Sequence, residues 1–194
     1  SSDVCSSDLT TFLQRYNEFA VDLAGMFIDE LHEQGHKASG RLIASVVARV
    51  SSALDEIDLA LSHLDYGIIV NTGIAANRVP YSRGSGAKTS KFIDALIAWI
   101  RLRGIAGGLD KKVRSVAFAM ATAMKRDGVP TKGSYKFTNN GRRTQWIDYV
   151  YNKYNVSWQD RIELIADDYI EMAFDSMLEK TVSKYPTYLE FSKI

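Results

Sequence analysis

Apolar side chains recur at helical intervals along most of the chain. From Phe12 to Leu31 they follow one another every three to five residues, which predicts an amphipathic helix over about residues 10–34 that ends at Gly35. The same spacing predicts five later helices, over residues 63–72, 92–103, 113–127, 146–154 and 157–184. We expect Ser157 to cap the last of these helices at its N-terminus and Pro186 to follow its C-terminus.

The period of the pattern shortens to two between residues 41 and 62. Alternate residues from Leu42 to Val50 are apolar, and the alternation resumes from Ile57 to Leu61 after a short polar turn. This pattern predicts an antiparallel β-hairpin with one buried face, although Ala and Leu would also tolerate a continuing helix. Residues 188–191 are a candidate for one more strand. The predicted class is α+β, with a long N-terminal helix, a small antiparallel sheet and several packed helices.

A chain of 194 residues suits a single domain, which we place over residues 10–194. Residues 1–9, SSDVCSSDL, repeat the triplet Ser-Ser-Asp and resemble a translated sequencing adapter, so we expect a leader foreign to the protein. They contain Cys5, the one cysteine, which excludes an internal disulfide and a multi-cysteine metal site. No apolar run reaches the roughly 18 residues of a membrane span, and no membrane partner is expected.

Charge is distributed very unevenly along the chain. Residues 78–143 contain 15 Lys or Arg and three acidic residues, whereas the rest contains nine basic and 20 acidic residues. The formal net charge of +1 therefore conceals two blocks of opposite sign. Such an asymmetry indicates a macromolecular partner, either a polyanion or the acidic side of another copy.

Two glycine-containing basic loops are predicted within the basic block, over residues 74–90 and 131–143. Three interpretations stay open: a solvated face, contact with DNA phosphates, or docking onto acidic residues of a neighbouring copy such as Asp55, Glu56 and Asp58. The candidate contact residues are Arg78, Arg83 and Lys88 in the first loop and Lys132, Lys136, Arg142 and Arg143 in the second.

Aromatic side chains are dense after the second loop. Trp146, Tyr149 and Trp158 are candidates for a subunit interface, because aromatic rings bury much area there at small entropic cost. A helix packed against the core of its own chain would use the same residues, and the sequence favours neither alternative. Trp99 is expected in the core.

No residue pattern supports catalysis, a metal site or a cofactor. His32, His36 and His63 are considered as metal ligands. His32 and His36 are four residues apart, but Gly35 interrupts their turn, and no acidic residue is placed to complete the set. The acidic residues between Glu163 and Asp175 are expected to form a solvated helix face. Residues 83–89 lack the spacing of a phosphate-binding loop. We therefore expect a protein that is not an enzyme and that carries no cofactor.

Four segments in order resemble a known family. They are SGRLIASV (39–46), YGIIVNTG (66–73), FIDALIAWIRLRGI (92–105) and SVAFAMATAMKRDGVPT (115–131). Together they are similar to the minor tail or head–tail joining proteins of tailed bacteriophages, the tail-completion and neck components. Arg103 stands where the family has Lys, and the loop after Arg78 is long and basic for the family.

The resemblance implies a structural virion protein that is assembled in the bacterial host cytoplasm. Its partners would be other copies of itself in a ring and neighbouring portal, neck or tail-tube proteins, with possible nonspecific contact to genomic DNA. The alternative function is a DNA-binding accessory protein without sequence preference, whose affinity would fall steeply with salt.

Overall fold

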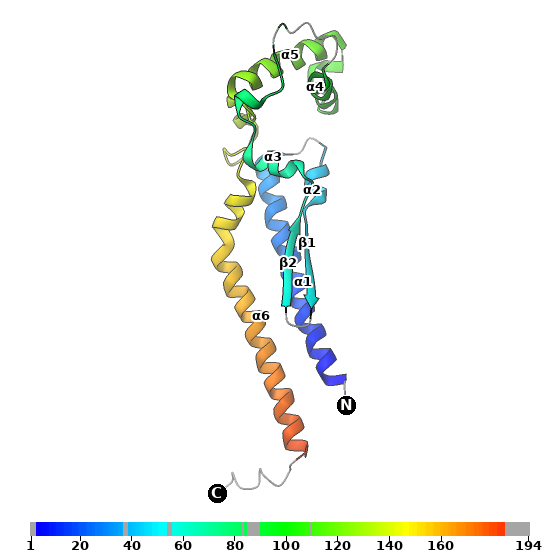
Figure 1. Cartoon of the computed structure of the whole chain (residues 1–194), viewed down its shortest axis with the longest axis vertical. Coiled ribbons are helices and arrows are strands. Elements are labelled where there is room, and N and C mark those ends of the chain that lie inside the picture. The colour runs from blue at the N-terminus through cyan, green and yellow to red at the C-terminus, as the bar shows by residue number, and fades with distance from the viewer. Residues whose placement is uncertain are drawn as a thin grey trace. The chain divides into compact units, whose positions relative to one another are not determined.

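Helices make up most of the fold, and one two-stranded hairpin interrupts them (Figure 1). The computed structural model describes residues 3–36, 39–53, 56–82, 84, 90–108 and 110–184, of which residues 3–9, 53, 56, 106 and 108 are described by their backbone alone. The predicted α+β class, with a small antiparallel sheet, is confirmed. In chain order the elements are α1 (Asp3–Glu33), α2 (Arg41–Ser45), β1 (Val47–Ala53), β2 (Glu56–Ser62), α3 (Tyr66–Thr72), the 3-10 helix η1 (Ala76–Arg78), α4 (Lys91–Leu102), η2 (Ile105–Gly108), α5 (Asp110–Asp127), η3 (Lys132–Phe137) and α6 (Trp146–Lys184).

The chain divides into two compact units. The first unit comprises Ser1–Leu23, Ala48–Leu61 and Asn152–Ile194, and the second comprises Ala24–Val47 and Ser62–Tyr151. The boundary passes through α1 and α6, so each of these helices contributes one part to each unit. The expectation of a single domain stays a prediction.

In the first unit, α1 and α6 pack through aromatic and aliphatic side chains. The rings of Phe12 and Tyr169 lie 4.4 Å apart, and Tyr154 stacks on Trp158 along α6. Removing these side chains from water stabilises the pair of helices. The buried apolar residues are Phe19, Ala20 and Leu23 of α1 and Trp158 and Ile165 of α6.

In the second unit, α4 and α5 lie next to each other (Figure 1). The hydroxyl of Ser90 accepts a hydrogen bond from the backbone N–H of Ile93 and caps α4, and Gly104, with φ of 63°, follows its end. The apolar stripe predicted for each helix is confirmed as their shared core. Its buried members are Ile93, Leu96, Ile100, Val113, Ala117 and Ala121.

A short β-bridge joins the segment that follows α3 to the segment that follows α5. Ile74 and Val129 exchange backbone hydrogen bonds of 2.7 and 2.8 Å in antiparallel register. Gly128 permits this approach, because a Cβ there would lie 2.7 Å from the carbonyl oxygen of Ile74 and its φ is 86°. Gly73 ends α3, as the sequence predicts.

The hairpin is shorter than predicted. Residues 41–45, expected to open its first strand, form the helical turn α2 instead. The Ser45 hydroxyl holds this turn, since it donates to the carbonyl of Leu42 at 2.7 Å and accepts from the backbone N–H of Leu64 at 3.1 Å. In β2 the alternation is confirmed, because Asp58 is exposed while Ile57 and Leu59 are partly covered.

The two helices predicted after residue 145 are one continuous helix, α6, of 39 residues. Ser157, expected as a cap, lies inside it. The sequence contains no Gly or Pro from Trp146 to Lys184, so nothing local stops the helix. The longest helix is therefore C-terminal, and the N-terminal α1 has 31 residues.

The sequence makes one prediction for each end of the chain, a foreign leader over residues 1–9 and a strand over residues 188–191. The backbone of α1 begins at Asp3, inside the segment 1–9 that the sequence sets apart as a leader. The foreign origin of that segment stays a prediction. The candidate strand at 188–191 lies outside the described residues.

Candidate functional site

A cleft of about 1020 Å³ opens in the second unit. Its walls come from the end of α1, from α2 and α3, from the end of α4, from α5 and η3, and from the segment that precedes α6. Ligand pockets are commonly of this size. The cleft is therefore large enough for a ligand or for a side-chain cluster of a partner.

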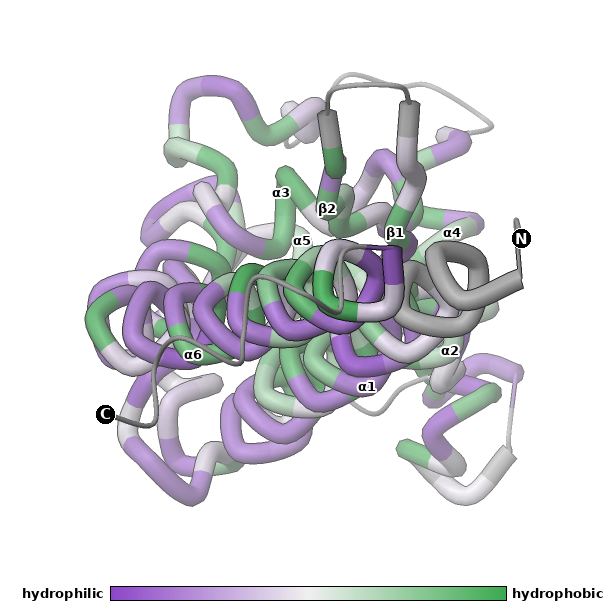
Figure 2. The backbone as a smooth tube through the Cα atoms, turned by 90° about the horizontal axis from the view of Figure 1, so that it is seen from below, coloured by the Kyte–Doolittle hydropathy of each residue, from purple (hydrophilic) through white to green (hydrophobic). Residues whose placement is uncertain are grey.

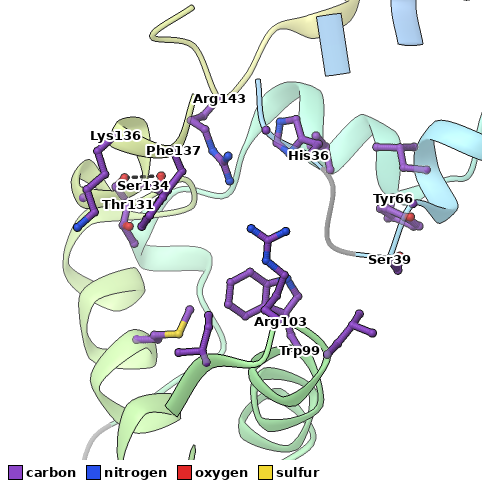
Figure 3. A pocket seen from close by; sticks show the side chains of 18 residues that line it. His36, Ser39, Tyr66, Trp99, Arg103, Thr131, Ser134, Lys136, Phe137 and Arg143 are labelled. Atoms are coloured by element: carbon purple, nitrogen blue, oxygen red, sulfur yellow. Dashed lines mark hydrogen bonds between the residues drawn. The ribbon is translucent and has the colours of Figure 1, made fainter. Parts of the chain in front are cut away.

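Three cationic side chains line this cleft: Arg103, Lys136 and Arg143. In Figure 3 the guanidinium groups of Arg103 and Arg143 point toward each other across the space. None of the residues that line the cleft is Asp or Glu, and among the described residues these three cations form no ion pair. The cleft is thus positively charged.

Arg143 is fixed by the end of α1. Its Nη1 donates to the backbone carbonyl of Gln34 at 2.8 Å. A Cβ on Gly35 would lie 3.0 Å from that nitrogen, so glycine lets the side chain approach. Burial and the neighbouring charge of Arg103 both lower the pKa of Arg143.

Arg103 is positioned by the end of α4. It is the residue that follows the last turn, and its guanidinium lies 5.9 Å from the ring centre of Trp99. Trp99 also lines the cleft, so part of the surface expected in the core faces this space. The cation–π contact holds the arginine without neutralising its charge.

His36 lies across the cleft from Arg103 (Figure 3). Burial, followed by the charge of Arg143, lowers its pKa from 6.5 to about 4. Its Nε2 is 3.3 Å from the amide oxygen of Gln34. The imidazole is therefore neutral at neutral pH.

Arg142, the neighbour of Arg143, contacts other residues of its own chain. Its Nε lies 3.3 Å from a carboxylate oxygen of the buried Glu30, and its guanidinium stacks 3.5 Å from the ring centre of Tyr149. Glu30 also accepts hydrogen bonds from Gln34 and Asn140. Arg142 thus ties the segment before α6 to α1, and its expected role as a partner contact stays a prediction.

The remaining predicted cations are spread along the second unit. Arg78 is exposed in η1, and Lys132 is exposed at the start of η3, so part of the segment expected as a loop is helical. Lys136 lies over the ring of Phe137 at 5.0 Å. Arg83 and Lys88 lie outside the described residues, as does Asp55, and Glu56 is described by its backbone alone.

The aromatic candidates belong to the interior. Trp146 is fully buried, and its Nε1 donates to the carbonyl of Gly67 at 3.2 Å. Its ring also meets Phe27 and His63 edge-on. Trp146 therefore packs within its own chain, and its interface role stays a prediction. Trp158 is buried in the first unit, and Tyr149 is covered by Arg142.

The first unit has an acidic surface that the sequence predicts in part. The acidic face of α6 follows four-residue intervals, which place its members in one row along the helix. Asp168 lies outside this row and pairs with Arg15, and Asp22 of α1 pairs with Arg161 at 2.7 Å. The exposed members of the row are Glu163, Asp167, Glu171, Asp175 and Glu179.

Beside this acidic row, α6 exposes apolar side chains. Hydrophobic and hydrophilic positions both occur around the helix (Figure 2). Phe174 is 60% exposed and Met177 is 66% exposed. Leu178 is exposed as well. The exposed residues at four-residue intervals are Ile170, Phe174, Leu178 and Val182.

The two units differ in net charge. Counted over the sequence, the first unit contains 15 acidic and seven basic residues, which gives −8. The second contains eight acidic and 17 basic residues, which gives +9. The asymmetry seen along the sequence is therefore an asymmetry between two compact bodies.

No protein family, curated protein or solved structure matches this chain. Its own residues must carry any functional argument. The described residues contain no group of three or more His, Cys, Asp or Glu that could hold a metal ion. Within the same part of the chain, no helix is both long and apolar enough to span a bilayer.

Sequence reasoning missed two features of these surfaces. Arg103 belongs to a predicted helix end and not to a predicted basic loop, although its position just before Gly104 marks it as a C-terminal cation. The exposed apolar row of α6 was missed because apolar residues occur on the exposed face of that helix as well as on its buried face. The absence of amphipathicity in so long a helix is the signal that could have revealed a second contact surface.

Proposed function

We propose that this protein is a structural assembly protein whose copies associate head to tail, with the acidic first unit of one copy against the basic second unit of the next. The observation that carries the proposal is the opposite net charge of the two units, −8 and +9. A head-to-tail contact needs two different, complementary faces on each copy, and it closes into a ring when the rotation between copies allows. Opposite charge on two bodies of one chain meets that requirement.

The exposed surface of α6 supports this proposal. Its apolar row, Ile170 to Val182, lies beside its acidic row, so contact with a basic partner would remove the apolar groups from water while the acids meet cations. The helix α5 of the second unit offers matching features. Phe118 is exposed there, among the exposed cations Lys111, Lys112, Arg114, Lys125 and Arg126.

Within this proposal, the four segments that resemble head–tail joining proteins suggest where the assembly belongs. The protein would act in a tailed-phage virion as part of a connector or tail-completion ring between the portal and the tail tube. It would work by geometry and contact, without catalysis.

Charge reversal tests head-to-tail assembly directly. One variant carries K111E, K112E and R114E on α5, and a second carries E171K, D175K and E179K on α6. Mass measurement should show that each variant alone dissociates, because like charges now meet, and that an equimolar mixture of the two assembles again, because every contact between unlike variants joins opposite charges. High salt should weaken the wild-type assembly. A wild-type protein that stays monomeric at every concentration contradicts the proposal, as does a mixture that remains dissociated.

The acid-free cleft favours a second candidate function, a DNA-binding accessory protein without sequence preference. Its three cations would neutralise phosphates without reading bases. A salt titration separates the candidates. DNA affinity that falls linearly with the logarithm of salt concentration, in a protein that does not self-associate, would replace the assembly proposal with this one.

A further inference from the structure

The cations of the cleft differ from three other arginines of the same unit. Arg101, Arg126 and Arg142 each pair with a carboxylate of the described chain. By contrast, Arg103, Lys136 and Arg143 have no such partner among the described residues, although they line one space. Folding has therefore gathered positive charge here and has left it unneutralised.

Arg143 shows this most clearly. One of its nitrogens donates to Gln34, but its buried Nε has no hydrogen-bond partner among the described residues. A buried donor without a partner costs free energy, and such groups in native proteins commonly meet a water or an ion. The opposing guanidinium of Arg103 adds repulsion, which an anion between the two would relieve (Figure 3).

The chemistry of the walls indicates which anion fits. One guanidinium group can bind two oxygens of a phosphate at once. The guanidinium groups of Arg103 and Arg143 face each other here. A phosphate monoester carries a charge of about −1.5 to −2 and would neutralise this cluster more fully than a single carboxylate. Phe137 at the rim is largely exposed, so its ring is accessible for stacking by a base.

We propose that this cleft is a binding site for a phosphate group, supplied either by a free nucleotide or by the backbone of a nucleic acid. Arg103 and Arg143 bind the phosphate oxygens, and Lys136 adds charge at the rim. The site needs no second copy of the chain, so it does not depend on head-to-tail assembly.

Binding of three probes to the full chain tests this site: pyrophosphate, adenosine monophosphate and a short single-stranded oligonucleotide. Calorimetry measures the first two, and fluorescence anisotropy measures the third. The main variant is Arg103→Gln, because Arg103 is exposed and its recorded contact is with Trp99. Loss of a charge-assisted hydrogen bond should weaken binding by about tenfold or more. Arg143→Lys is the second variant, and it keeps the charge but loses the paired geometry.

Arg114→Gln is the matched control. Arg114 is exposed on α5 and lies 5.9 Å from the ring centre of Phe118, the same distance that separates Arg103 from Trp99. Because it lies outside the cleft lining, this variant should change binding by less than about twofold, as expected for one screened surface charge. Circular dichroism verifies that each variant is folded.

The outcomes separate the possible ligands. Binding of pyrophosphate or the mononucleotide, weakened by Arg103→Gln, supports a site for free phosphate compounds. Binding of the oligonucleotide alone, with the same dependence, supports a nucleic-acid backbone. The proposal is overturned if no probe binds, or if Arg114→Gln weakens binding as much as Arg103→Gln. It is also overturned if phosphate probes do not bind while Arg103→Gln reduces self-association, since the cleft then accepts carboxylates of another copy.

Discussion

The two units of this chain differ in the sign of their net charge and in how their charged side chains are paired. In the first unit, arginines meet carboxylates at exposed positions, as in the pairs Arg15–Asp168 and Arg161–Asp22, and the acidic row of α6 is exposed. In the second unit, the buried carboxylate of Glu30 organises a network, and the described residues that line the cleft include three cations and no acid. A near-neutral chain is therefore composed of one acidic and one basic body.

The units also differ in how they cover apolar surface. In the second unit, α4 and α5 enclose a shared core, and Trp146 is fully buried. In the first unit, α6 buries one face and exposes another that is equally apolar. Exposed apolar rows of this kind mark contact surfaces more often than they contribute to a monomer's stability. The comparison shows that α4 and α5 bury the apolar stripes that face each other, whereas α6 leaves one apolar row in water.

Truncating one large aromatic residue in each unit gives the strongest test. Trp146→Ala should lower the free energy of unfolding by about 3–5 kcal/mol, because it leaves a cavity and removes the hydrogen bond to Gly67. Phe174→Ala should change it by less than about 0.5 kcal/mol in the monomer, because its ring is already in water. Denaturant titration of both variants measures the difference. Equal losses would mean that α6 is covered within the monomer.

Removing one carboxylate from each unit is the next test. Glu30 is 7% exposed and has three hydrogen-bonding neighbours, so Glu30→Gln should cost about 2–3 kcal/mol, less than for a fully buried pair because Arg142 is partly solvated. Asp22→Asn should cost less than about 1 kcal/mol, because its pair with Arg161 is exposed. Chemical denaturation compares the two directly, and a larger loss from Asp22→Asn would reverse the contrast drawn here.

A pH dependence specific to the second unit should have the smallest effect. The folded pKa of His36 is about 4 and its ordinary value is 6.5, so the unfolded chain binds more protons between these values. Stability due to His36 should therefore be complete above pH 6.5 and fall as pH is lowered toward 4. Because the ring is partly solvated, we expect a loss on the order of 2 kcal/mol.

His36→Gln should remove this part of the pH dependence. Nuclear magnetic resonance titration of the ring gives the folded pKa directly. A value at or above 6.5 would show that neither burial nor Arg143 acts on His36 as the structure indicates.

Local patterns in the sequence were enough to place most helices. The stripes of α4 and α5 and the glycines that follow α3 and α4 are local signals, because helix periodicity and a positive φ each depend on a few neighbouring residues. The error at residues 41–45 has a tertiary cause. Residues 41–45 alternate like a strand, yet a hydrogen bond from Leu64 to the Ser45 hydroxyl holds them in a helical turn.

The candidate sites depended still more on tertiary structure. Arg142 and Arg143 are adjacent residues of the same type, and the sequence does not distinguish them. In the structure, Arg142 pairs with Glu30, whereas Arg143 donates to the carbonyl of Gln34 and lines the cleft. Trp146 and Phe174 are both aromatic residues of α6, and only packing decides that one is core and the other is exposed. These distinctions depend on residues distant in sequence, which periodicity cannot register.

By itself, the sequence determined the helical segments, the α+β class and the existence of two blocks of opposite charge. The tertiary structure alone decided that these blocks belong to separate compact units, that three cations with no ion pair among the described residues share one cleft, and that α6 keeps an apolar row in water. The physical reason is that charge and hydropathy are properties of single residues. Burial, ion pairing and the accumulation of like charge arise only when distant segments meet.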